Sequence, residues 1–353
     1  MSAGRIRDLS QEPPAGDLTT DVLIVGSGCA GATAARGLAR AGREVLVLEE
    51  GGDFTGEKLT QRDGRMYDQL YMDRGGRMTS DLSIAIMQGR VLGGSAVINA
   101  SDVVALPDEV LRFWQAKFGL TDYAPEKLEP YRQLALADLR ASRISDEQIN
   151  RANHLLQEGA DKLGLKGEVM MHNRVGCRGL GTCLIGCPIG AKQNPRFVAI
   201  PEALDAGATF CCRARAARIE DATAEIKRVQ VRSLDENGYH ETGGFTVRAR
   251  VVILAANAIG SAHLVLRSGL GNAHVGQHLS LQPQLPMVAW FDEPVIGYRG
   301  IPQAFAVTEG ERFDDEHGLW CFRIEALMGT PGIVASLLPK TGAEAKEAMA
   351  HYN

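Results

Sequence analysis

We predict an α/β fold with a parallel sheet from three segments near the N-terminus. Residues 21–26, DVLIVG, form an apolar run that is typical of a buried parallel strand. Residues 29–41 are rich in Ala and Leu and are followed by Gly42, which predicts a helix. Residues 44–49, EVLVLE, repeat the strand pattern, so the three segments together make a strand–helix–strand unit.

A glycine-rich turn joins the first of these strands to the helix. Gly26, Gly28 and Gly31 have the spacing G-x-G-x-x-G, which permits a tight turn, close approach of a pyrophosphate and close helix–strand packing. Glu49 ends the second strand, where an acid hydrogen-bonds a ribose hydroxyl, and Glu50 is a second candidate for this role. The alternative is a glycine turn without a ligand. The combination predicts a Rossmann-like dinucleotide site.

Composition limits the other classes of function. The 353 residues are enough for two domains, and 45% hydrophobic with 23% charged residues is ordinary for a globular protein. The net charge of −5 and the lack of a basic block argue against a nucleic-acid partner. No apolar stretch reaches membrane-spanning length, and the N-terminus lacks the apolar core of a signal peptide. We therefore expect a cytoplasmic chain, or a periplasmic one if it is exported with a signal-bearing partner.

The remaining segments follow the same α/β pattern. Residues 1–19 are predicted to be a flexible arm, and residues 53–88 to be irregular. Further elements are expected as follows: largely helical structure at 108–165 with interruptions at Pro125 and Pro130, a helix at 197–206, strands within 209–253 with a hairpin turn at Asn237-Gly238, a strand at 250–256 and a helix at 258–268.

Four segments resemble the glucose–methanol–choline (GMC) oxidoreductases: EVLVLEEGG at 44–52, GRVLGGSAVIN at 89–99, ARAARI at 214–219 and RVVILAANAIGSAHLVLRSGLG at 250–271. The resemblance implies that the dinucleotide is FAD. It places Gly93, Gly94 and Ser95 against the pyrophosphate or the flavin ring, Asn99 at a polar position of the same segment, and the backbone near Ala217 against the adenine. No second G-x-G-x-x-G is present for a nicotinamide nucleotide.

The resemblance also implies the domain organisation. Residues 20–107 and 190–285 are expected to form a discontinuous FAD-binding domain of GMC type. Residues 108–189 and 286–353, mostly helical and irregular, are expected to form part of a substrate or cap domain that includes the cysteine loop. Two positions depart from the family pattern. Asn257 stands where the family favours Gly, and Gln282 replaces its His.

No catalytic residue is assigned. In the family the catalytic His lies in a C-terminal part that we expect to be missing here. The histidines at 263, 274, 278 and 317 are expected at the surface or as satisfied structural residues, and the surroundings of His351 do not match the catalytic segment.

Cys177, Cys183 and Cys187 lie in CRGLGTCLIGCP and match three cysteines of a ferredoxin-type run, with Leu180 at the missing position. This segment resembles that of bacterial FAD-dependent sugar dehydrogenases, which implies a [3Fe-4S] cluster. The alternatives are a purely structural loop and a zinc site completed by His172, Cys211 or Cys212. Cys29 is expected to pack in the helix. Cys211, Cys212 and Cys321 are expected in the core.

The resemblance implies an FAD-dependent dehydrogenase that oxidises the hydroxyl of an alcohol or sugar by hydride transfer to the flavin. Electrons would pass through the cluster to an external acceptor such as a cytochrome or a small partner subunit. Two alternatives stay open. One is an oxygen-using long-chain alcohol oxidase, and the other is a non-catalytic FAD-binding or electron-transfer chain.

Overall fold

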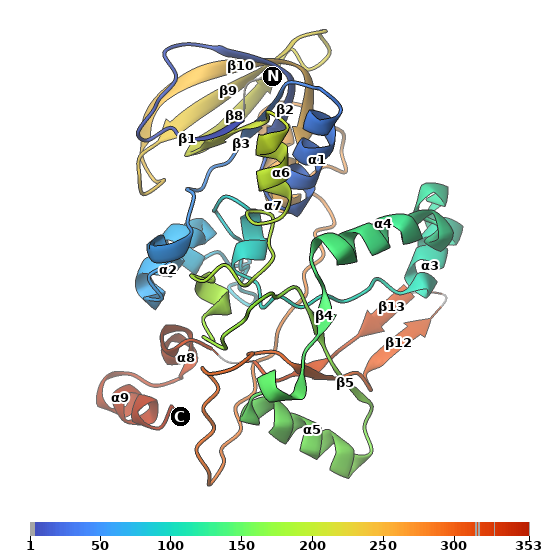
Figure 1. The fold of residues 1–353 in the computed structure, drawn as a ribbon, viewed down its shortest axis with the longest axis vertical. Coiled ribbons are helices and arrows are strands. Elements are labelled where there is room, and N and C mark those ends of the chain that lie inside the picture. Colours follow the sequence, from blue (N-terminus) through green and yellow to red (C-terminus); the bar gives the residue numbers. More distant parts are fainter. Residues whose placement is uncertain (1–3, 315, 317, 328, 353) are drawn as a thin grey trace. The chain divides into compact units, whose positions relative to one another are not determined.

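The computed structural model describes residues 4–314, 316, 318–327 and 329–352 (Figure 1). The chain divides into two compact units. The first unit contains Met1–Ile98, Ile185–Gly190 and Asn194–Val288, and the second contains Asn99–Leu184, Ala191–Gln193 and Ala289–Asn353. The first unit ends its N-terminal segment at residue 98, whereas the FAD-binding domain is expected to extend to residue 107. The assignment of the units as FAD-binding and substrate domains stays a prediction.

The first unit is built on a seven-stranded sheet of order β1-β7-β3-β2-β10-β9-β8. The five strands from β1 to β10 in this order are parallel, whereas β9 and β8 are antiparallel additions at one side. The bounds are β1 (Arg5–Asp8), β7 (Thr209–Cys212), β3 (Val45–Leu48), β2 (Leu18–Val25), β10 (Glu241–Leu254), β9 (Lys227–Leu234) and β8 (Ala214–Glu220).

Both faces of the parallel strands are covered, which explains their continuous apolar sequence. On one face, Val22, Ile24, Val45 and Val47 pack with alanines of α1 (Cys29–Arg40) and α6 (Ala199–Asp205). On the other face, Leu23, Val25, Leu46 and Leu48 pack with Leu264 of α7 (Asn257–Arg267). Figure 1 shows α1 and α6 side by side. Their small side chains allow helices and sheet to approach closely, so the core is dense around the strands that end at the glycine turn.

Most of the expected elements of this unit are confirmed. The strand–helix–strand unit is β2–α1–β3, the helices expected at 197–206 and 258–268 are α6 and α7, and Gly42 follows α1 with a φ of +78°. Asn237-Gly238 lies between β9 and β10, within a six-residue connection rather than a two-residue turn. A helix, α2 (Asp63–Leu70), forms inside the stretch expected to be irregular.

The prediction of a flexible arm at residues 1–19 is wrong for part of it. Residues 5–8, RIRD, form β1 and pair in parallel with β7, and β2 begins at Leu18. The segment is short and polar, so its own sequence gives no strand pattern. Its pairing depends on β7, about 200 residues later in the chain, and a non-local partner leaves no trace in local propensity.

The second unit combines helices with small antiparallel sheets. Its larger sheet has the order β14-β11-β5, and α5 packs on β11 through Ala160, Phe305 and Val307. Its elements are α3 (Asp108–Phe118), α4 (Pro125–Asp138), β4 (Ser142–Arg143), α5 (Arg151–Leu163), β5 (Gly167–Val169), β6 (Met171–His172), β11 (Phe305–Val307), β12 (Glu311–Asp314), β13 (Gly318–Cys321), β14 (Ile324–Glu325), α8 (Pro331–Leu337) and α9 (Gly342–Ala350). The helical character expected at 108–165 is confirmed, although Pro130 lies inside α4 rather than interrupting it.

Short 3₁₀ helices lie at Gly56–Lys58, Met72–Gly75, Gly94–Val97, Thr121–Tyr123, Asp146–Gln148 and Cys183–Ile185. Among the described residues, no helix is long and apolar enough to cross a membrane.

Candidate functional site

The glycine turn between β2 and α1 is fixed by its protein neighbours at two of its three glycines. Gly26 has a φ of +102°, and a Cβ there would stand 2.4 Å from the carbonyl oxygen of Ala255. A Cβ on Gly31 would stand 1.9 Å from the carbonyl oxygen of Gly26. Both distances are far below contact distance, so larger residues are excluded at these two positions by the fold itself.

Gly28 is different, because the protein leaves room beside it. Its φ of −64° and ψ of −171° suit any residue, and a Cβ there would meet only the Cα of Gly94, at an ordinary 3.8 Å. Neither backbone strain nor protein packing explains a glycine at this position. A ligand that lies against the backbone does explain it, which is the role that the motif assigns to its second glycine.

The first turn of α1 presents backbone donors on this side. Gly28 is the N-cap, no side chain caps the helix, and its first turn contains no acidic residue. The first N–H groups of a helix have no intrahelical partner and carry the positive end of the helix dipole. An anion such as a pyrophosphate is therefore stabilised at this terminus.

Glu49 follows β3 and lies beneath the turn. The side chain is buried, and its Oε2 accepts hydrogen bonds from the backbone N–H and the Oγ of Ser27, at 3.1 and 2.5 Å, while Oε1 accepts from the N–H of Gly51 at 2.8 Å. Burial raises the pKa of Glu49 above its ordinary value, and the three hydrogen bonds oppose that shift. A carboxylate has room for about four donors, so one acceptor position is left for a ribose hydroxyl. Glu50 instead pairs with Arg215, at 3.1 Å.

Ser27 is a site residue that the sequence motif does not identify. Its side chain is fully buried and joins three backbone segments, because Oγ donates to Glu49 and accepts from the N–H of Gly93 at 3.0 Å. The position is an x in G-x-G-x-x-G, where the motif specifies no chemistry. Only the spatial neighbours of Ser27 show its role.

The second glycine segment lies directly against the first. Gly93 and Gly94 have φ values of +101° and +66°, and a Cβ on Gly94 would stand 2.7 Å from the Cα of Gly28. Ser95 accepts a hydrogen bond from the N–H of Gly89 at 2.9 Å, which closes the loop on itself. The structure therefore brings together all the glycines predicted to contact the dinucleotide, with Glu49 and Ser95.

Three other predicted positions have different surroundings. Asn257 begins α7 with a φ of +67°, a left-handed conformation that favours glycine, and its Oδ1 accepts from the N–H of Ile259. Ala217 is skipped where the register of β8 against β9 shifts, so it has no partner in β9. Asn99 belongs to the second unit, where its Oδ1 accepts from the N–H of Ser101 and its carbonyl accepts from Lys192.

These features fit a bound dinucleotide. Three features lie together at the carboxyl ends of the neighbouring parallel strands β2 and β3. They are the space beside Gly28, the uncapped N-terminus of α1 and the remaining acceptor position of Glu49. Open α/β sheets bind ligands at this edge. The fold positions this site at the buried carboxyl-terminal ends of β2 and β3.

Two buried arginines lie near the end of β7 in the same unit. Arg90 donates to the carbonyl oxygens of Gly238 and Asn237, at 2.8 and 3.1 Å. Arg213 has a φ of +58°, and its Nε and Nη1 are buried without a hydrogen-bond partner. Burial lowers the pKa of Arg213, and the nearby charge of Arg90 lowers it further. The side chain of Arg90 therefore stabilises the turn at residues 237–238 through two hydrogen bonds to its carbonyl oxygens.

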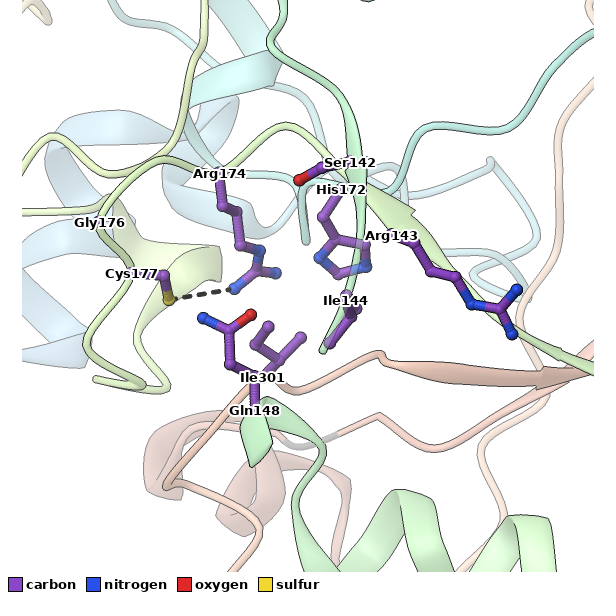
Figure 2. Close-up of a pocket in the computed structure, with 9 residues that line it drawn as sticks. All are labelled: Ser142, Arg143, Ile144, Gln148, His172, Arg174, Gly176, Cys177 and Ile301. Atoms are coloured by element: carbon purple, nitrogen blue, oxygen red, sulfur yellow. Dashed lines mark hydrogen bonds between the residues drawn. The ribbon is translucent and has the colours of Figure 1, made fainter. Parts of the chain in front are cut away.

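A small pocket of about 50 Å³ lies in the second unit (Figure 2). In this view the side chain of Arg174 lies between those of His172 and Cys177, and Ile144 and Ile301 form an apolar side of the pocket. Nη1 of Arg174 lies 4.0 Å from Sγ of Cys177, the contact drawn in Figure 2, and 3.4 Å from Sγ of Cys183. The pocket is lined by Ser142, Arg143, Ile144, Gln148, His172, Arg174, Gly176, Cys177 and Ile301.

His172 is buried beside this pocket. Its Nε2 lies 2.9 Å from Oδ1 of Asp102, although the two groups are not aligned as a hydrogen bond. Burial lowers the pKa of His172, and the carboxylate of Asp102 only partly opposes this effect. The imidazole is therefore neutral near pH 7.

The expected metal sites find no support in the described part of the chain. Within it, no group of three or more His, Cys, Asp and Glu side chains is arranged to hold a metal ion. Cys177 and Cys183 belong to the second unit and share Arg174, whereas Cys187 belongs to the first. Cys211 and Cys212 are buried in β7, as expected of core residues.

The remaining predictions concern single residues. Cys29 is exposed at the start of α1, so the expectation that it packs in the helix is wrong. The expected surface positions of His263, His274 and His278 are confirmed, and His351 is also exposed. His317 and the side chain of Cys321 lie outside the described residues.

Comparison with known proteins decides the family. A family model described as GMC oxidoreductase matches residues 67–284, more than half of the chain. The chain belongs to the GMC oxidoreductase family. A second model, described as an NAD(P)-binding Rossmann-like domain, matches residues 24–85, which contain the glycine turn and Glu49. Family and fold together support FAD as the cofactor.

Several curated proteins are similar over most of the chain. An uncharacterised GMC-type oxidoreductase of Mycobacterium tuberculosis is 34% identical over 327 residues, covering 92% of this chain and 50% of its own length. The long-chain-alcohol oxidase FAO4A of Arabidopsis thaliana is 28% identical over 351 residues, covering 94% of this chain and 46% of its own. The chain thus spans about half the length of the curated relatives it matches.

A solved structure supports the fold. The crystal structure of a pyridoxine 4-oxidase aligns with a TM-score of 0.54 at 18% sequence identity, covering 71% of this chain and 52% of that one. The predicted fold class, an α/β fold with a Rossmann-like domain of GMC type, is confirmed.

Proposed function

We propose that this chain is the FAD-binding part of an oxidoreductase that oxidises the hydroxyl of an alcohol. The proposal rests above all on the unexplained space beside Gly28. The packing of the protein does not require a glycine at this position. A pyrophosphate that lies against the uncapped N-terminus of α1 requires one, because a side chain would occupy its space. Family membership specifies that the dinucleotide is FAD.

The chemistry that FAD supplies when bound is acceptance of a hydride from the carbon that carries the hydroxyl. The residues of this chain bind and orient the cofactor. The N–H groups at the start of α1 hold the negative charge, and Glu49 accepts from the ribose. Gly93 and Gly94 bring the second loop close without side chains. Ser27 links Glu49 to Gly93 and holds these elements in register.

We propose molecular oxygen as the electron acceptor. Relatives from different organisms are named as oxidases, including long-chain-alcohol oxidases of Arabidopsis thaliana and the 6'''-hydroxyparomomycin C oxidase of Streptomyces lividus. The expected [3Fe-4S] cluster at Cys177, Cys183 and Cys187 has no support in the described residues, which contain no group of three such side chains arranged to hold a metal ion. The proposed route of electrons from the flavin to oxygen therefore includes no iron–sulfur cluster. The dehydrogenase with a cytochrome acceptor is the alternative that the experiment below tests.

We assign the proton-removing base to none of the described histidines of the first unit. His240, His263, His274 and His278 are all exposed. General-base catalysis requires a group within hydrogen-bond reach of the substrate hydroxyl. A chain that binds FAD but reacts with no alcohol is therefore the competing function, a flavin-binding or electron-transfer protein.

Anaerobic titration of the FAD-loaded chain separates these functions. We expect the visible flavin absorbance to bleach on addition of a long-chain primary alcohol and to return when air is admitted. Return only with cytochrome c or a quinone would favour a dehydrogenase. Bleaching by a sugar alone would move the substrate class away from alcohols. A full flavin spectrum that no alcohol or sugar bleaches would sink the catalytic proposal.

Iron and acid-labile sulfide are measured on the same sample. We expect neither at a stoichiometric level. Three iron atoms per chain, with Cys177, Cys183 and Cys187 all protected from alkylation, would restore the cluster and the acceptor route that it implies.

A further inference from the structure

The cysteine loop of the second unit contains a pair of thiols that the proposed function does not use. Both sulfurs lie on one guanidinium nitrogen, Nη1 of Arg174, at 4.0 Å for Cys177 and 3.4 Å for Cys183. The two sulfurs are therefore no further apart than the sum of these distances. The N–H of Gly179 also donates to Sγ of Cys177, at 3.4 Å. Both side chains are half-buried, so small molecules reach them.

The surroundings of Cys177 suit attack on a small polar electrophile. Cys177 lines the pocket of about 50 Å³, which has room for a molecule slightly larger than water. The guanidinium of Arg174 faces this space, with the neutral His172 and the amide of Gln148, whereas the guanidinium of Arg143 points away from it. The thiolate is the nucleophilic form of cysteine, so attack by Cys177 requires loss of its thiol proton.

The geometry also separates this pair from the other cysteines. Cys211 and Cys212 are buried in the core, and burial raises the pKa of both thiols, for Cys211 to about 11. Cys187 belongs to the other unit. Among the described cysteines, Cys177 and Cys183 are half-buried and contact one shared guanidinium, and Cys177 also lines the pocket.

We propose that Cys177 and Cys183 are a peroxide-reactive dithiol that closes to a reversible disulfide. The Cys177 thiolate attacks one oxygen of the peroxide, so an S–O bond forms, the O–O bond breaks and water leaves after protonation. The Cys183 thiol then attacks the sulfenic sulfur, an S–S bond forms, the S–O bond breaks and a second water leaves. Two thiols are oxidised and one hydrogen peroxide is reduced to two waters.

The loop can make the movement that this closure requires. An S–S bond is about 2 Å long, so the two sulfurs must approach each other and their contacts with Arg174 must change. Gly176 and Gly179 have φ values of +64° and Gly181 of +72°. A Cβ on Gly176 would meet nothing within 4 Å, so the movement would centre on Gly176 rather than on Gly179 and Gly181, which pack against Gly300 and the carbonyl oxygen of Tyr298. Glycines of this kind allow backbone changes that other residues resist.

The test follows from the position of Arg178 between the two cysteines. Trypsin cleavage after Arg174, Arg178 and Lys192 places Cys177 in one peptide and Cys183 with Cys187 in another. The purified, FAD-loaded chain is fully reduced, treated with one equivalent of hydrogen peroxide, alkylated and mapped by mass spectrometry. We expect the two peptides to be joined and dithiothreitol to separate them.

Variants decide which sulfur is the partner. Cys187→Ser keeps the joined peptides and Cys183→Ser loses them, leaving a sulfenic acid on Cys177 that a 1,3-dione probe labels. Arg174→Leu slows the reaction with peroxide at least tenfold and Arg174→Lys restores part of the rate. Arg112→Leu, an exposed arginine of the same unit, leaves it unchanged.

Several outcomes would overturn the dithiol. Loss of the joined peptides in Cys187→Ser would assign the bond to Cys187 instead. Oxidation of Cys177 no faster than that of the exposed Cys29, or an unchanged rate in Arg174→Leu, would remove the role of the pocket. Stoichiometric iron on the three cysteines would make them metal ligands. None of these readouts involves alcohol oxidation, so the dithiol and the proposed function fail independently.

Discussion

Replacing Gly28 by Ser separates the fold from the binding site. Ser is a better N-cap than Gly by a few tenths of a kcal/mol, and the backbone of Gly28 already has the extended conformation that an N-cap requires. The added Cβ stands 3.8 Å from Gly94, an ordinary contact. We therefore expect the apo chain to be as stable as the wild type, or slightly more stable.

Binding of FAD is expected to change in the opposite direction. The new side chain fills the space beside α1 and its hydroxyl caps an N–H that otherwise faces the pyrophosphate. A hydrogen bond to a charged group contributes about 1.5–3 kcal/mol. Since 1.4 kcal/mol is a factor of ten in affinity, loss of one such bond weakens FAD binding roughly 10- to 100-fold.

Two measurements on one preparation test this prediction. Quenching of FAD fluorescence gives the dissociation constant, and urea denaturation of the apo chain followed by circular dichroism gives the stability. Gly37→Ala, in the same helix with nothing within 4 Å of its Cβ, is the control that leaves binding unchanged. An unchanged FAD affinity in Gly28→Ser would refute the assignment of this space to a pyrophosphate. A destabilised apo chain would show that the glycine serves the fold.

The remaining predictions concern buried groups. Ser27→Ala removes a hydrogen-bond donor to Glu49 and lowers the free energy of unfolding by about 2–4 kcal/mol at pH 7. Because the pKa of Glu49 is raised in the folded state, this loss shrinks as the pH falls through that pKa. A loss that does not change with pH in urea titrations would contradict this prediction. Arg90→Met destabilises the fold by about 2–4 kcal/mol, because two hydrogen bonds to backbone carbonyl oxygens are lost. Arg213→Met costs less than about 1 kcal/mol, because Nε and Nη1 of Arg213 are buried without a hydrogen-bond partner. Equal losses of stability for the two variants in thermal unfolding would argue against this difference. Cys211 resists alkylation in the native chain until the pH approaches its pKa of about 11, and rapid labelling at pH 8 would show that β7 opens locally.

The sequence predicts the centre of the first unit well because local and global signals agree there. The strands β2 and β3 are buried on both faces, so their apolar runs report burial directly. Gly26 is required because it packs against Ala255 at the end of β10, and Gly31 because it packs against the carbonyl oxygen of Gly26. The G-x-G-x-x-G motif specifies glycine at both positions, so the sequence predicts them. Asn257 has a left-handed backbone conformation that favours glycine, so its backbone is compatible with the glycine of the family pattern.

The features that sequence analysis misses depend on partners far away in the chain. Ser27 acquires its role from Gly93, β1 from β7, and Arg90 from the turn at residues 237–238. The cysteine spacing predicts three ligands, whereas the structure joins Cys177 and Cys183 through Arg174. Spacing alone does not show which side chain lies between two thiols, and an arginine there changes the chemistry that they favour.

The strand order of the first unit has a consequence for synthesis of the chain on the ribosome. β2 has β3 on one side and β10 on the other, and about 190 residues separate β3 from β10 in sequence. At roughly 5–20 residues per second, translation of this interval takes on the order of 10–40 s. During that time β2, whose second half is apolar, has one edge without its partner, which invites pairing with other chains. The nascent protein is therefore expected to need chaperone protection until residue 254 has emerged.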